Sequence, residues 1–157
     1  MLTIALDRRA QRRADARRAV KEDFTARRNV ASAARAVHRA LESEMRWRPL
    51  LHGKVKLALV DTLMVAVSEV GRDHPSVTRW MLWQWSEIDK LERQWLSSLW
   101  RRPITASQYG TAWAVAIGKL SATLTEWAAD QVDDDWFDQQ VNQELAAGGS
   151  YVVGPVE

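Results

Sequence analysis

The sequence of 157 residues contains no cysteine, which excludes a disulfide scaffold, a cysteine-based zinc site and catalysis by a thiol. Proline and glycine are also scarce, at four and seven residues, which argues against an all-β protein built from many tight turns. The most apolar stretch, residues 55–70, contains Lys56 and Asp61 and is shorter than a transmembrane helix requires. No targeting signal is recognisable, so we expect a cytoplasmic protein without a membrane partner.

The sequence contains no recognisable catalytic or metal-binding motif. The three histidines, His38, His52 and His74, share no metal-ligand spacing. The chain has neither a glycine-rich phosphate loop nor a serine nucleophile motif. Residues 133–135 and Asp138 offer carboxylates to Mg²⁺, although helix capping and hydration explain these acids more simply. We therefore expect no catalytic residue, no metal and no cofactor, and a protein that is not an enzyme.

Positive and negative charges are concentrated in opposite parts of the chain. Residues 1–56 carry fifteen Lys and Arg, most of them arginines, against six Asp and Glu. Residues 57–157 carry seven against fourteen, so the net charge of +2 hides two poles of opposite sign. Arginine pairs bidentately with phosphate. The asymmetry indicates either a polyanionic partner for the basic part or two poles that meet between subunits.

Hydrophobic spacing and the positions of proline and glycine predict helices throughout. The expected helices cover residues 7–47, 53–70, 76–101, 105–127 and 135–147, with Thr105 or Ser107 as the cap of the fourth. These elements form one domain over residues 1–147, in which residues 1–16 are a flexible basic arm that orders on binding. Residues 148–157 are expected to be extended or disordered. The predicted fold is all-α, a bundle of four or five helices with a long basic N-terminal helix.

The first helix carries six bases along one line, which we call the basic stripe. At 100° per residue, all six lie within about 20° of one azimuth, and they extend over roughly 44 Å. The opposite side is apolar and mostly small, so another helix can pack closely there. Two explanations remain open, contact with nucleic-acid phosphates and a merely solvated face. The basic stripe consists of Arg17, Lys21, Arg28, Arg35, Arg39 and Arg46.

Nine tryptophans are well above the usual number for a chain of 157 residues. Four of them repeat at helical spacing and are expected in the core: Trp80, Trp95, Trp113 and Trp127. Three others depart from this spacing and are interpreted as contacts to a partner, with base stacking and core packing as alternatives: Trp83, Trp85 and Trp100. Trp47, between two arginines, is either a base-stacking residue or a residue that closes the bundle.

In its size, its all-helical class and its basic stripe from Arg17 to Arg46, the chain resembles the small subunits of CRISPR effector ribonucleoproteins. The resemblance implies a non-catalytic antiviral-defence subunit that contacts RNA or DNA strands, alongside larger protein subunits and further copies of itself. The alternative is a protein–protein adaptor, or a phage-type assembly or inhibitor module, that uses the three off-spacing tryptophans and the acidic C-terminal pole. A helix-turn-helix regulator ranks last, because no short helix pair with a suitable turn is apparent.

Overall fold

The computed structural model describes residues 2–47, 52–98 and 103–147, and the side chains of residues 11–42, 60–98 and 108–147. These residues form five helices and no strand, which confirms the all-α prediction. The predicted tail, residues 148–157, lies outside the described residues. The helices are α1 (Leu2–Trp47), α2 (His52–Val70), α3 (Pro75–Ser98), α4 (Pro103–Ala128) and α5 (Asp134–Ala146).

Two helices begin earlier than the sequence predicted. α1 starts at Leu2, so residues 2–16, the expected arm, continue the same helix. α4 starts at Pro103 and not after a cap at Thr105 or Ser107. Proline fits the first turn of a helix because the N–H that it lacks would have no intrahelical partner there.

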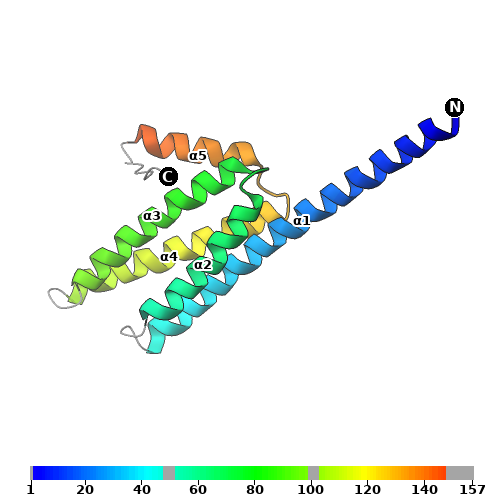
Figure 1. The fold of residues 1–157 in the computed structure, drawn as a ribbon. Helices are drawn as coiled ribbons and strands as arrows, with labels where there is room; N and C mark the ends of the chain where they lie inside the picture. Colours follow the sequence, from blue (N-terminus) through cyan, green and yellow to red (C-terminus); the bar gives the residue numbers. More distant parts are fainter. Residues whose placement is uncertain (1, 48–51, 99–102, 148–157) are drawn as a thin grey trace, which may run out of the picture.

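The helices pack around α1 and α4 (Figure 1). α1 packs against α2 on one side and α4 on the other, α4 packs against α3, and α5 covers α3. α2 and α3 touch sparsely, because they diverge from the short turn that joins them. The N-terminal part of α1 extends well beyond the other helices, so it projects from the bundle as a single helix.

The predicted apolar side of α1 is buried against α2 and α4. Val30, Val37 and Leu41 are fully buried, and the alanines between them let the neighbouring helices approach closely. Burial of this apolar side begins at about Ala26, whereas every described side chain from 11 to 22 is exposed. Among the described side chains of α1, hydrophobic burial is therefore limited to the part from about Ala26 to Leu41.

The four tryptophans predicted for the core are all buried, as expected. Trp80 and Trp127 meet Phe137 edge to face, with ring centroids 5.1 Å and 6.3 Å apart, and this contact fixes α5 to the bundle. Trp95 packs beside Trp113 at 5.6 Å and against Gly110, where an added Cβ would lie 3.1 Å from the indole nitrogen. The glycine therefore sets how closely α3 and α4 approach.

Candidate nucleic-acid interface

The basic stripe lies on one unbroken helix. α1 runs without interruption past all six of its positions. The five members with described side chains, Arg17 to Arg39, are all exposed. Arg17 and Arg39 are 22 residues apart, which corresponds to about 33 Å along the helix axis. The side chain of Arg46 lies outside the described residues.

The charges of the stripe are not neutralised within the part of the chain that the structure describes. Among the described side chains, none of the five bases forms an ion pair with a carboxylate. The guanidinium of Arg28 lies over the ring of Phe24, 5.6 Å from its centroid, and Arg35 Nε donates to the backbone oxygen of Ala31 at 3.3 Å. Among the described residues of α1, the one acid close to the line, Glu42, lies 3.4 Å from His38 Nε2. Glu69 of α2 lines the same pocket as Lys21 without forming an ion pair with it. A row of positive charge is thus left facing solvent.

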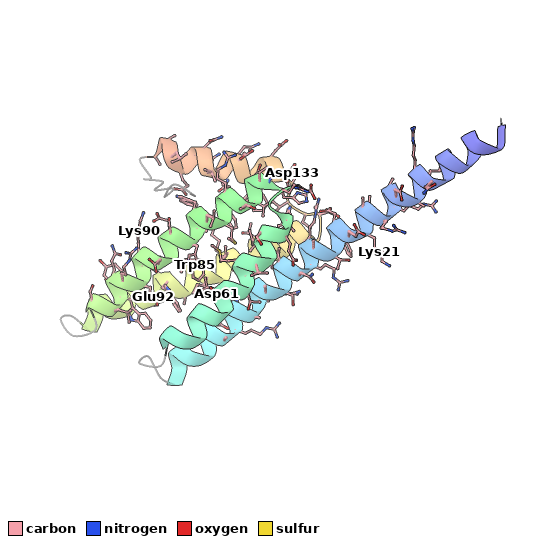
Figure 2. The ribbon with its side chains drawn as sticks, in the orientation of Figure 1. Lys21, Asp61, Trp85, Lys90, Glu92 and Asp133 are labelled. Carbon is pink, nitrogen blue, oxygen red and sulfur yellow. The ribbon has the colours of Figure 1, made fainter. Side chains whose placement is uncertain are left out.

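The stripe faces away from the bundle. Its azimuth is opposite to the side of α1 that carries Val30 and Val37, which are buried against the other helices. Figure 2 shows Lys21 on α1 where the helix leaves the bundle. Lys21 borders an open pocket whose wall also includes Glu69 of α2, so a linear ligand that follows the stripe passes beside α2 at this point.

The projecting part of α1 is joined to the bundle by a group of polar contacts around His74, in the turn between α2 and α3. We call this group the His74 cluster, and its further members are Asp23, Arg27, Trp127, Asp130 and Asp134. His74 Nδ1 donates to Asp134 Oδ2 at 2.6 Å, and Nε2 donates to Asp23 Oδ1 at 2.8 Å. Since both partners are carboxylates, both ring nitrogens can donate only when the imidazole is protonated. When the ring is protonated, the cluster therefore holds a cation between a carboxylate of α1 and a carboxylate of α5.

Burial lowers the pKa of His74, as does the nearby charge of Arg27. The hydrogen bonds to Asp23 and Asp134, together with the negative charge of Asp134, raise the pKa by more. The pKa of His74 therefore lies above its ordinary value of 6.5. The ring of His74 also packs edge to face on Trp127, at a centroid distance of 5.1 Å.

Arg27 supplies the second link between α1 and the rest of the cluster. Its guanidinium contacts Asp23 at 3.0 Å and Asp130 at 2.8 Å, and it lies over the ring of Trp127 at 5.1 Å. Asp130, two residues after α4 ends, adopts a positive φ of 55°, which is a conformation that aspartate tolerates better than most residues. Trp127 Nε1 donates to Asp134 Oδ1 at 3.0 Å, which connects the two halves of the cluster.

The acidic residues at the start of α5 are engaged in local structure. Asp133 is the N-cap of α5 and accepts the backbone N–H of Trp136 at 2.9 Å, which agrees with the capping interpretation. Asp138 accepts from Ser76 at 2.8 Å. An open pocket of about 420 Å³ lies against the cluster, with Asp73 and Asp133 on its wall. Among the described residues, no three acids or histidines are arranged to hold a metal ion.

The structure corrects the interpretation of Trp83. Its side chain is only 7% exposed and belongs to the core, so it is not available to a partner in this fold. The physical reason is that α3 packs against both α4 and α5, so more than one line of positions is buried. Trp85 is half-buried beside the core and is labelled in Figure 2, and Trp100 lies outside the described residues.

Sequence reasoning found the stripe but missed the role of His74. A signal was present, since Asp23 falls on the same side of α1 as Ala19 and Ala26, where a carboxylate needs a polar partner. The chain matches no protein-family model, no curated protein and no solved structure to which it was compared. Within the described residues, none of the helices combines the length and the apolar character needed to cross a membrane.

Proposed function

We propose that this protein is a non-catalytic subunit that binds the backbone of nucleic acid through its basic stripe. The observation that supports the proposal is the row of five exposed bases, Arg17 to Arg39, for which the described residues provide no carboxylate partner. The stripe follows one unbroken helix, and its five described side chains are exposed. It therefore presents a linear positive surface to a linear polyanion.

The energetics of the stripe favour such a ligand. The pairs Arg17/Lys21 and Arg35/Arg39 are like charges at i,i+4 spacing, and each pair destabilises an isolated helix by about 0.2–0.5 kcal/mol. Phosphates relieve this repulsion, and the release of their condensed counterions favours binding. Contacts of this kind position a protein on a strand without reading its sequence. We therefore expect binding that is strong at low salt and almost independent of sequence.

The setting proposed for this activity is a larger ribonucleoprotein of the CRISPR effector kind. The chain resembles the small subunits of such complexes in its size and its helical class. In such an assembly the larger proteins would carry the guide and any catalysis, and this chain would follow the strand. The acidic residues around α5 would face the basic surface of a neighbouring subunit. The adaptor alternative receives less support, because Trp83, one of its proposed anchors, is buried.

Charge reversal tests the proposal. The triple variant R28E/R35E/R39E removes three adjacent bases from the stripe and changes the net charge from +2 to −4, since each reversal subtracts two charges. The control R72E/R79E/R93E makes the same change in net charge at exposed arginines outside α1, of which Arg79 pairs with Asp138 and Arg93 with Asp89. Binding of fluorescent single-stranded and duplex oligonucleotides is measured by anisotropy at low salt, and helicity by circular dichroism.

We expect the stripe variant to lose binding by at least about 100-fold, while the control loses much less and both remain helical. If both variants lose binding equally, net charge and not the stripe determines affinity. If the unmodified protein fails to bind either oligonucleotide at low salt, or the stripe variant binds as well as the unmodified protein, the proposed function is wrong.

A further inference from the structure

An exposed aromatic side chain lies directly beside the basic stripe. Phe24 is 46% exposed, and Val20, one turn earlier on α1, is 70% exposed. At 100° per residue, Phe24 lies about 40° from Arg28 on the helix surface. Both residues lie within one turn of Lys21, which Figure 2 labels where α1 leaves the bundle, and both are exposed to solvent.

We propose that the ligand of the stripe is a single strand and that one of its bases stacks on Phe24. This inference rests on the proposed function and specifies the class of nucleic acid. Base stacking on aromatic side chains is a main source of affinity for single strands, and it tolerates any sequence because every base has a π face. In a duplex, neighbouring base pairs cover those faces, so Phe24 gains nothing there unless the stack is opened.

Two basic side chains of the stripe flank Phe24, one on each side along the helix axis. Lys21 is three residues before Phe24 and Arg28 is four residues after it, which places positive charge about 4.5 Å and 6 Å away along the axis. These two side chains can neutralise the phosphates on either side of the nucleotide whose base stacks on the ring.

The present position of Arg28 is consistent with this arrangement. Its guanidinium lies over the Phe24 ring at 5.6 Å and covers part of one face. A base that stacks on the ring takes the place of the guanidinium, which then becomes available to an adjacent phosphate. A flat cation thus occupies the site that a flat base takes in the complex. An exposed apolar pair can also bind a protein helix. The positive side chains around it, Arg17, Lys21 and Arg28, make an apolar helix a less suitable ligand.

The test compares F24L, which keeps an apolar side chain but loses the π face, with F24W, which keeps one. V115A, at an exposed apolar residue of α4, is the matched control. Affinity for a single-stranded oligonucleotide and for the corresponding duplex is measured over a range of salt concentrations. Phe24 is exposed on one helix, so all three variants should fold, and circular dichroism checks this.

We expect F24L to weaken single-strand binding by about tenfold or more, and F24W and V115A to bind like the unmodified protein. Duplex binding should not change, and the dependence of F24L affinity on salt should keep its slope, because no phosphate contact is lost. Equal or tighter binding of duplex by the unmodified protein, or no effect of F24L on the single strand, would overturn the inference while leaving the proposed function standing. Dissociation of an oligomer by F24L with single-strand binding unchanged would instead make this surface a protein contact. Absence of all binding would end both proposals.

Discussion

Replacement of His74 by glutamine separates the charge of the His74 cluster from its shape. Glutamine is close in size to histidine and can donate to one carboxylate, but it carries no charge and does not titrate. In H74Q, either Asp23 or Asp134 therefore loses its hydrogen bond, and both lose the cation between them. The variant tests whether the imidazolium connects the projecting helix to α5.

The expected loss of stability follows from the two hydrogen bonds. A hydrogen bond to a charged group contributes about 1.5–3 kcal/mol. The side chains of Asp23 and Asp134 are 35% and 33% exposed, so water replaces part of what is lost. We expect the free energy of unfolding to fall by about 2 kcal/mol at acidic pH, which corresponds to a decrease in Tm of about 4–8 °C for a chain of this size.

The pH dependence gives a sharper result than the magnitude. Because the pKa of His74 is higher in the folded state than its ordinary value of 6.5, protonation stabilises the fold. This contribution is complete below about pH 6.5 and disappears as the pH rises through the folded-state pKa. The difference in unfolding free energy between the unmodified protein and H74Q should therefore be largest just below about pH 6.5 and should shrink as the pH rises above it.

Urea unfolding followed by circular dichroism and tryptophan fluorescence measures this difference at each pH. D135N, a substitution at an exposed acid of α5 outside the cluster, serves as the control and should not alter the pH profile. If the unfolding free energies of the unmodified protein and H74Q change in parallel with pH, His74 does not act as a cation between the two carboxylates.

Three further substitutions test the packing around the site, each by urea unfolding. D133A removes the N-cap of α5 and should cost about 1 kcal/mol. G110A places a methyl group against the Trp95 indole, 3.1 Å from its nitrogen, and should cost about 1–3 kcal/mol because the helices must separate slightly. W127F removes the donor to Asp134 and part of a buried ring, and should cost about 2–4 kcal/mol. A variant as stable as the unmodified protein would show that the corresponding contact is not made.

The order of the helices follows from local features of the sequence. Pro49, Gly71 and the run at residues 148–149 interrupt long stretches of helix-forming residues, so their positions divide the chain almost as the structure does. The orientation of α1 follows equally directly, because a row of small apolar residues opposite a row of bases permits only one side to be buried. The basic stripe could therefore be found before any tertiary contact was known.

The parts that sequence reasoning missed depend on contacts between distant residues. His74 is 51 residues from Asp23 and 60 from Asp134, and no local spacing connects the three. The burial of Trp83 depends on α3 having two neighbours, whereas a single line of apolar positions assumes one. The exposure of Phe24 depends on where the other helices end along α1, which the sequence of α1 does not contain.

The salt dependence of single-strand binding tests the role of the basic stripe most directly. Suppose that each of the five described basic side chains of the stripe neutralises one phosphate. A plot of the logarithm of the association constant against the logarithm of salt concentration should then have a slope of about −3.5. In R28E/R35E/R39E the slope should be about −1.4 or closer to zero. A slope near zero for the unmodified protein, or the same slope in the triple variant, would contradict the assignment of the stripe as the nucleic-acid contact.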